Sequence, residues 1–205
     1  MPQPDAEREP DWRTFVFKNR GLLLVPVALV LVLFGAPSLR SAVVGVAVAA
    51  LGECIRIWAV GYSGVTTRSD EVTAPQLVTA GPYAYIRNPL YVGNAIIALG
   101  FWLAFSGNVP MLTSFALFAA VAVLVVGVYA TIIPLEEAYL ARTFGDAYES
   151  YRRVVPRIVP FSAPLPPEER EGRWNGEVIA KAEIITLVYF AVMIGAVLFR
   201  LRAAR

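Results

Sequence analysis

The chain contains no histidine and one cysteine, and both scarcities limit its chemistry. Histidine is the commonest metal ligand and the side chain best suited to proton transfer near pH 7, so histidine-based metal sites and bases are excluded. A single thiol, Cys54, cannot form an internal disulfide. We therefore expect no metal, and any acid–base step must use Glu, Asp or Tyr side chains.

Charge is scarce as well. Only 17% of the 205 residues are charged and 57% are hydrophobic, whereas soluble domains are about a quarter charged. This balance is typical of a protein solvated by lipid. The net charge of +2 is too small to indicate a nucleic-acid partner.

Charge-free runs divide the chain into membrane spans, since about 20 apolar residues cross a bilayer core. Residues 21–39 predict a first span and residues 41–62 a second. The run within residues 88–135 holds 48 residues without a charge, enough for two helices, and residues 106–110 form a turn signal in its middle. Residues 184–199 predict a fifth span. The fold class is therefore an all-α integral membrane protein with about five transmembrane helices.

The remaining segments complete the predicted organisation. Residues 1–20 form a polar arm, and residues 21–62 hold the two N-terminal membrane helices. Residues 63–160 form the core of the protein, residues 161–177 a proline-rich connector, and residues 178–205 the last membrane helix with a basic tail. Small residues in the second span permit close helix packing; they are Gly45, Ala47, Ala49, Ala50 and Gly52.

Lysine and arginine indicate the orientation. Thirteen of the eighteen lie in residues 1–20, 62–87 and 136–181. By the positive-inside rule these segments face the cytoplasm, so we expect an integral (inner) membrane protein with its polar loops on that side. Five spans then place the basic tail outside, which the rule disfavours. The sequence leaves open whether the last helix lies partly in the interface.

Polar and aromatic residues gather in residues 77–93. Gly81 and Pro82 predict a turn, and Asn88 and Pro89 predict a helix start with asparagine as the N-cap. Such a start presents unpaired backbone N–H groups that attract a carboxylate or phosphate. The alternative is an ordinary cap followed by an interfacial aromatic belt. Three aromatic rings add faces for a cation or an adenine, those of Tyr83, Tyr85 and Tyr91.

A second polar group begins at Glu136 and Glu137, at the end of the charge-free hairpin. Adjacent carboxylates beside a membrane are costly unless paired. Neighbouring residues point about 100° apart on a helix, so one can face a ligand amine while the other meets arginine or water. The alternative is a solvated helix start that suits the helix dipole. Residues 136–151 predict an amphipathic helix on the membrane surface.

Together the two groups resemble the isoprenylcysteine carboxyl methyltransferase and phospholipid methyltransferase superfamily. That family carries Arg-His-Pro-x-Tyr-x-Gly, an apolar hairpin and Glu-Glu-x-x-Leu. The matching residues here are Arg87-Asn88-Pro89-Leu90-Tyr91-Val92-Gly93 and Glu136-Glu137-Ala138-Tyr139-Leu140. The flanks at residues 77–83 and 144–157 agree too, and Arg56-Ile57-Trp58-Ala59 is similar to the end of the family's preceding helix. The resemblance covers about residues 50–160.

The resemblance implies S-adenosylmethionine-dependent methyl transfer, without a metal, to a lipophilic or lipid-modified acceptor among the membrane lipids. The site would lie on the cytoplasmic side, between the 62–91 loop and the 134–160 segment. The implied catalytic residues are Arg56, Arg87 and Asn88, with the arginines able to hold an anionic acceptor. The implied cofactor-binding residues are Leu77, Val78, Gly81, Pro82, Tyr83, Asn88, Pro89, Tyr91, Gly93, Glu136 and Glu137.

One departure from the family pattern matters for the mechanism. Asn88 stands where the family usually has histidine, and asparagine exchanges hydrogen bonds but cannot act as a base. A carboxylate or a thiolate needs no base at the moment of attack, which favours a carboxylate or thiol acceptor, whereas an amine must lose a proton. Alternatives are a phospholipid amine N-methyltransferase, a sterol-type NADPH reductase and a non-catalytic relative. The acceptor and the oligomeric state stay open.

Overall fold

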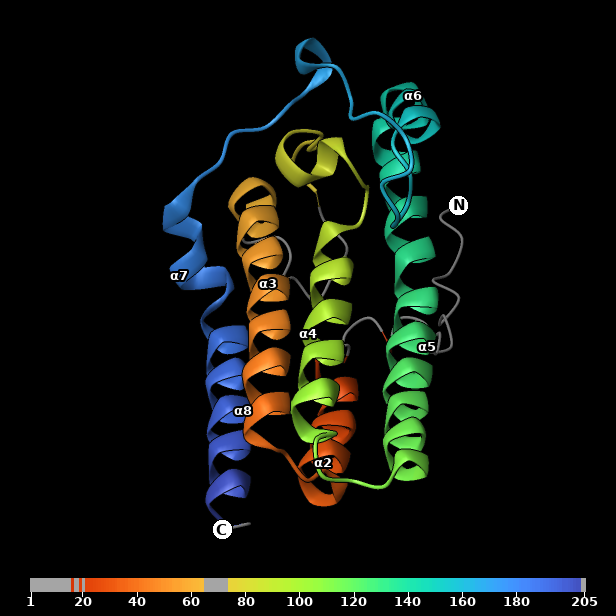
Figure 1. The fold of residues 1–205 in the computed structure, drawn as a ribbon. Coiled ribbons are helices and arrows are strands. Elements are labelled where there is room, and N and C mark those ends of the chain that lie inside the picture. Colours follow the sequence, from red (N-terminus) through yellow and green to blue (C-terminus); the bar gives the residue numbers. More distant parts are fainter. Residues whose placement is uncertain (1–15, 17–18, 20, 65–73, 204–205) are drawn as a thin grey trace, which may run out of the picture.

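The computed structural model describes residues 16, 19, 21–64 and 74–203, and the described residues form helices and no strands. The predicted arm at residues 1–20 lies almost wholly outside the described residues. Five apolar helices run along the molecule (Figure 1): α2 Val25–Phe34, α3 Leu39–Ser63, α4 Pro89–Phe105, α5 Met111–Phe144 and α8 Ile184–Ala203. The all-α prediction is confirmed.

Three of these helices, α3, α5 and α8, are long and apolar enough to cross a membrane, whereas α2 and α4 are shorter apolar helices. Helix α2 has 10 residues, preceded by a 3₁₀ turn at Leu22–Leu24, so the predicted first span is too long. The helix ends at Phe34 because Pro37 restricts the residue before it to extended conformations. The count of five crossings stays a prediction.

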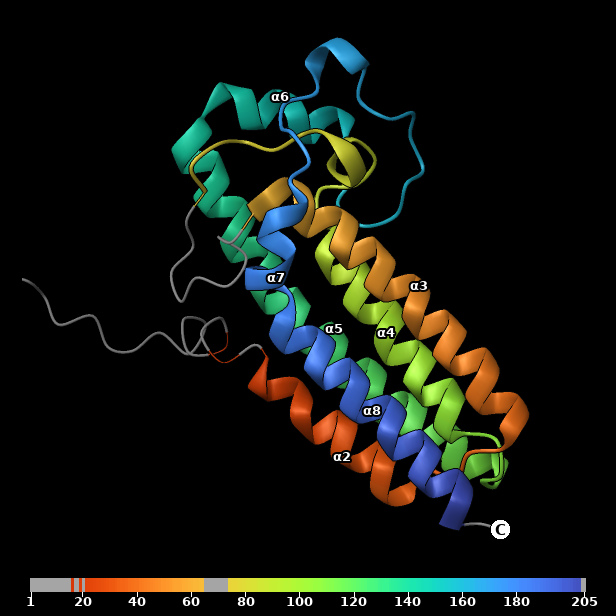
Figure 2. The ribbon, with the colours of Figure 1, turned by 90° about the vertical axis from the view of Figure 1, so that its left-hand side faces the viewer.

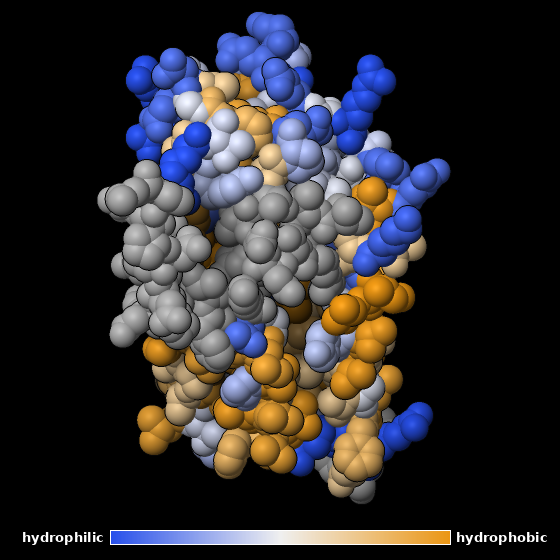
Figure 3. All heavy atoms as spheres, turned by 180° about the vertical axis from the view of Figure 1, so that it is seen from behind, coloured by the Kyte–Doolittle hydropathy of each residue, from blue (hydrophilic) through white to orange (hydrophobic). Residues whose placement is uncertain are grey.

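Surface hydropathy divides the molecule into an apolar part and polar ends. Figure 3 shows hydrophobic residues gathered over the lower part of one face, while hydrophilic residues crowd the end that carries the polar loops. Hydrophilic residues reappear at the opposite tip. An apolar band between two polar ends is the pattern expected of a chain that lies across a bilayer.

Helices α3 and α4 pack backbone against backbone. A Cβ atom added to Gly45 would overlap the backbone of Ala104, and one added to Gly100 would overlap the backbone of Ala49. About two turns nearer the polar end than Gly45, Gly52 approaches α4 in the same way. The predicted close-packing role of the small residues is confirmed for Gly45, Ala49 and Gly52, whereas Ala47 is exposed because it points away from α4.

Helix α8 lies along the bundle beside α2 and α3 (Figures 1 and 2). Near its C-terminal end, Arg200 donates a hydrogen bond of 2.6 Å to the carbonyl oxygen of Gly35 in the turn after α2. This bond satisfies a carbonyl that no helix pairs. The basic tail therefore lies at the end of the bundle opposite the polar loops, and α8 runs alongside the other apolar helices.

Helix α5 is longer than predicted. The turn at residues 106–110 is confirmed, since α4 ends at Phe105 and α5 begins at Met111. At a rise of 1.5 Å per residue its 34 residues extend about 50 Å, well beyond a bilayer core. Helix α5 continues through Pro134 to Phe144, so the surface helix predicted at residues 136–151 is wrong in its start. The amphipathic helix is α6, Asp146–Val154, after Gly145 with φ +51°.

The proline-rich connector packs against the loop before α4. Its Glu171 carbonyl accepts hydrogen bonds from the backbone N–H groups of Thr79 and Ala80, at 2.9 and 3.0 Å. Leu165 is buried, and its N–H donates to the carbonyl of Ala84. Short turns punctuate this region, namely η3 Gly81–Ala84, η4 Pro167–Glu169, η5 Gly176–Val178 and α7 Ile179–Ala182. The connector thus supports the polar end of the bundle.

The α3–α4 contact makes a stability prediction. We expect Gly100→Val to lower the free energy of unfolding by about 1–3 kcal/mol, because the new side chain forces the two backbones apart. Gly127→Ala is the matched control, since a Cβ at Gly127 meets nothing within 4 Å. Thermal unfolding of both variants in detergent checks this. Equal midpoints for the two variants would contradict the described contact.

Candidate functional site

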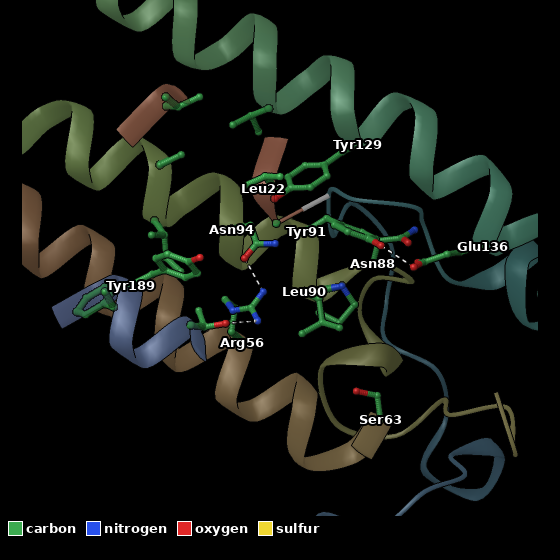
Figure 4. Close-up of a pocket in the computed structure, with 18 of the residues that line it drawn as sticks. Leu22, Arg56, Ser63, Asn88, Leu90, Tyr91, Asn94, Tyr129, Glu136 and Tyr189 are labelled. Carbon is green, nitrogen blue, oxygen red and sulfur yellow. Dashed lines mark hydrogen bonds between the residues drawn. The ribbon is translucent and has the colours of Figure 1, made fainter. Parts of the chain in front are cut away.

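A cavity of about 910 Å³ lies between the helices, and Figure 4 shows its centre. Its polar end is lined by the loop before α4, by the last turns of α5 and by α6. Its deeper part is apolar and is lined by side chains of α2, α4, α5 and α8, including Leu31, Phe101, Phe190 and Met193. One continuous space therefore joins a polar end to the interior of the apolar bundle.

Glu137 is the hydrogen-bonding centre of the polar end. Its Oε1 accepts from Arg87 Nε at 3.0 Å and from Asn88 Nδ2 at 3.2 Å, and its Oε2 accepts from Arg157 at 2.6 Å. The carboxylate is buried. Arg87 also donates through Nη1 to the backbone carbonyls of Arg152 and Val155. These charge-assisted bonds join α4, α5 and the segment after α6.

Asn88 occupies the N-cap position of α4 as predicted, but its side chain does not cap the helix. Its amide nitrogen instead donates to Glu137 and to the carbonyl of Arg157, the latter at 3.2 Å. The predicted capping bond is therefore wrong, because a buried carboxylate is the stronger acceptor. The helix start at Pro89 is confirmed.

Glu136 points away from this network and toward the cavity (Figure 4). The hydroxyl of Tyr91 donates to its Oε1 at 2.6 Å. The two adjacent carboxylates thus diverge as the helical angle predicts, Glu137 toward arginine and Glu136 toward the space a ligand can occupy. Both residues line the cavity, so their predicted role as cofactor ligands stays open to test.

Three tyrosines, of which Tyr148 and Tyr151 are buried and Tyr83 is half-buried, form another wall of the polar end. The hydroxyl of Tyr151 donates to the carbonyl of Tyr83 at 2.7 Å. Burial raises the pKa of Tyr83 and of Tyr151, and raises the pKa of Tyr148 to about 12. These hydroxyls are therefore neutral at physiological pH. Tyr85 lies outside the cavity, against Trp58 with ring centroids 6.3 Å apart.

Arg56 lies deeper, where the polar and apolar parts meet. Its Nη2 donates to both carboxylate oxygens of Glu183, at 2.8 and 2.9 Å, and its Nη1 donates to Oδ1 of Asn94. Thr186 accepts at 3.4 Å, and Glu53 lies 3.7 Å from Arg56 Nε. Arg56 thus connects α3, α4 and the start of α8. Its main described partner is the carboxylate of Glu183, and the implied role of Arg56 in holding an acceptor stays a prediction.

Of the predicted site residues, ten line the cavity: Arg56, Leu77, Val78, Tyr83, Arg87, Asn88, Pro89, Tyr91, Glu136 and Glu137. Gly81, Pro82 and Gly93 do not line it. At Gly81, with φ +62°, an added Cβ would overlap the ring of Tyr62, and at Gly93 it would lie 2.6 Å from Arg56 Cγ. These two glycines therefore support their neighbours by close approach.

Sequence reasoning missed Asn94, Glu183 and Thr186. A signal was present for Glu183, which is a lone carboxylate directly before the charge-free run of α8. Its side chain is fully buried, and such a carboxylate beside a membrane helix requires a partner. Asn94 is likewise the lone side-chain amide of α4. Neither pattern names the partner, which lies on another helix.

Comparison with known proteins gives a family match. A family described as phospholipid methyltransferase matches residues 41–147. The protein-S-isoprenylcysteine O-methyltransferase of Schizosaccharomyces pombe is 44% identical over 85 residues, covering 42% of this chain and 33% of that protein. The methanethiol S-methyltransferase of Crocosphaera subtropica is 37% identical over 92 residues, covering 44% and 32%.

The protein-S-isoprenylcysteine O-methyltransferase B of Arabidopsis thaliana is 32% identical over 123 residues, covering 57% of this chain and 58% of that protein. The chain thus spans between a third and three-fifths of the length of these relatives. No solved structure matches it. The family match contains Arg56, Arg87 and Glu137 and ends before α8.

The Glu137 network makes a second prediction. We expect Glu137→Gln to lower the free energy of unfolding by about 3 kcal/mol, because it leaves Arg87 buried without its carboxylate. Glu136→Gln is the control and should unfold close to the wild type, since Glu136 faces the cavity. Denaturation of both variants in detergent measures the difference. Equal loss in the two variants would mean that Glu137 does not hold the polar end together.

Proposed function

Because the chain belongs to the phospholipid methyltransferase family, we propose that it is an S-adenosylmethionine-dependent methyltransferase whose acceptor is lipophilic. The observation that carries the proposal is the single cavity in which Glu136 and Tyr91 adjoin an apolar space between membrane helices. The named relatives transfer methyl groups to a prenylated cysteine or to methanethiol, and this supports a carboxylate or thiol acceptor.

The residues of the cavity suit the proposed cofactor. S-adenosylmethionine carries an ammonium, a carboxylate and a sulfonium, so its net charge is positive. Glu136 offers carboxylate oxygens to the ammonium group, and Tyr83 offers an aromatic face to the sulfonium or the adenine. A volume of about 910 Å³ lies at the upper end of ligand pockets. It leaves room for an acceptor beside the cofactor.

When bound, the cofactor supplies a methyl group: the acceptor's lone pair forms the new bond, and the sulfonium keeps the electrons of the broken bond and leaves as a neutral thioether. Transfer of this kind depends on positioning and on exclusion of water. The Glu137 network holds the start of α4 against α5, which places Tyr91 beside Glu136. The apolar walls exclude water from the deeper part.

The alternatives find less support in the cavity. An amine acceptor must lose a proton, and Asn88, which stands where the family usually has histidine, cannot take it. A nicotinamide dinucleotide needs cations for its phosphates, yet both arginines among the described lining residues are already paired with carboxylates. A non-catalytic relative would not need a cavity that joins a polar end to an apolar interior.

Cofactor binding tests the proposal first. We expect calorimetry on purified protein to detect binding of S-adenosylmethionine and of S-adenosylhomocysteine. Glu136→Gln should weaken the binding of both compounds by more than about tenfold, because it removes the charged hydrogen-bond acceptor for their ammonium group. Glu149→Gln is the control, because Glu149 pairs with Arg152 on the partly exposed face of α6. A folded wild type that binds neither compound would contradict the proposal.

We also propose that the polar end faces the cytoplasm, which the concentration of arginine in residues 136–181 supports. Labelling of single cysteines in a Cys54→Ala background tests it. Ala163→Cys, in the exposed connector, should react in inside-out vesicles and not in intact cells. Met111→Cys, at the exposed start of α5, should show the opposite pattern. The reverse result for both positions would overturn the orientation.

A further inference from the structure

Exposed apolar side chains gather in the segment that follows α6. Phe161 is 82% exposed and Val159 is 62% exposed, and both Val154 and Ile158 are exposed as well. None of residues 154–161 is among the described residues that line the cavity. Apolar side chains that gather on a surface mark a contact with a partner or with a membrane. This segment therefore has a role outside the cavity.

Hydrogen bonds hold the segment level with the start of α4. The carbonyl of Pro156 accepts from the backbone N–H of Arg87 at 2.9 Å, and the carbonyl of Arg157 accepts from Asn88 Nδ2 at 3.2 Å. Arg87 and Asn88 directly precede Pro89, the first residue of α4. In Figures 1 and 2 the chain after α6 turns back toward the apolar helices before it rises to the connector. The exposed side chains therefore lie beside the polar end of α4.

The length of α4 gives this level a depth in the bilayer. As a membrane span, which the sequence predicts, its 17 residues extend about 25 Å, slightly less than a hydrocarbon core of about 30 Å. With the turn at residues 106–110 at one boundary of the core, Pro89 lies at or just within the other. The segment beside Pro89 then lies in the headgroup layer of that leaflet.

Positive charge lies beside the apolar side chains. Residues 149–161 hold three arginines and a single carboxylate, that of Glu149. Arg152 pairs with Glu149. Arg153 and Arg157 are exposed at the end of α6 and just after it. Arginine next to exposed apolar groups, at the depth of the headgroups, is complementary to anionic phospholipid.

We propose that residues 154–161 form a membrane-surface contact whose occupant is the headgroup layer of an anionic bilayer. Val159 and Phe161 enter that layer, and Arg153 lies beside the lipid phosphates. The contact is separate from methyl transfer and does not depend on it. Because Glu137 accepts a hydrogen bond from Arg157 at 2.6 Å, the lipid surface lies directly against the network that joins α4 to α5.

A fluorescent label on single cysteines tests the contact. In a Cys54→Ala background, Val159→Cys and Asp146→Cys each carry the same fluorophore, in vesicles of phosphatidylcholine and phosphatidylglycerol. Asp146 is the control, because α5 is about 50 Å long and places the start of α6 about 20 Å beyond the core. Lipids with a nitroxide near the headgroup should quench position 159 at least about threefold more strongly than position 146, and aqueous iodide should show the reverse order.

Two results would overturn the contact. Equal quenching by iodide at the two positions would mean that the segment faces water. Shielding of position 159 from both iodide and the nitroxide lipids would mean that protein covers the segment, as a second copy of the chain would. Both comparisons use the folded protein in a bilayer and need no further substitution.

Variants separate the charged part of the contact from the apolar part, with the label kept at position 159. Arg153→Gln should lower quenching by the nitroxide lipids about twofold, to the level in phosphatidylcholine alone. Arg142→Gln, on the exposed last turn of α5, is the matched control and should change nothing. Quenching that is independent of phosphatidylglycerol in the wild type overturns the part assigned to Arg153.

The apolar part is tested at Phe161. Phe161→Asp should raise quenching by iodide at least about threefold, because anionic lipid repels the new carboxylate, whereas Phe161→Leu should keep the wild-type value. The exposure of Phe161 predicts that both variants fold, which thermal unfolding checks. Wild-type quenching in a folded Phe161→Asp variant overturns the insertion of this side chain. If that variant does not fold, the comparison of positions 159 and 146 still decides the question.

Discussion

The polar end of the molecule depends on the buried carboxylate of Glu137. Three segments distant in sequence meet on its two oxygens: the start of α4 through Arg87 and Asn88, the end of α5, and the segment after α6 through Arg157. A charge buried at the edge of a membrane is tolerated only when it is paired and hydrogen-bonded. Satisfying this one group therefore determines how the loops are arranged around the cavity, and turns Glu136 and Tyr91 toward it.

The same constraint acts a second time, deeper in the bundle. Arg56 on α3 cannot remain unpaired there, and Glu183 supplies the charge from the start of α8. On the side of Arg56 away from the polar end, close packing of α3 on α4 through glycine and alanine leaves little room for side chains. The cavity accordingly forms on the other side of α4, among α2, α5 and α8. The cavity is polar near the two ion pairs, those of Glu137 and Arg56, and apolar beyond them.

Sequence reasoning succeeded where the signal was local. The turn at residues 106–110, the helix start at Pro89 and the close-packing face of α3 all follow from neighbouring residues, and the structure contains each of them. It was wrong about the start of the surface helix at residues 136–151, since α5 continues through Pro134 to Phe144. It was also wrong about the Asn88 cap. For Asn88 a tertiary partner, the carboxylate of Glu137, outweighed the local preference for capping.

By itself, the sequence determined that the chain is helical, lies in a membrane and carries the paired segments of a methyltransferase-like site. Hydropathy, proline placement and motif spacing are properties of short stretches, so they can be read without a fold. Only the tertiary structure decided which carboxylate faces the cavity and which arginine is neutralised. Arg56 and Glu183 lie 127 residues apart, and no local pattern specifies that pairing. It arises because two buried charges on neighbouring helices are far less costly together than apart.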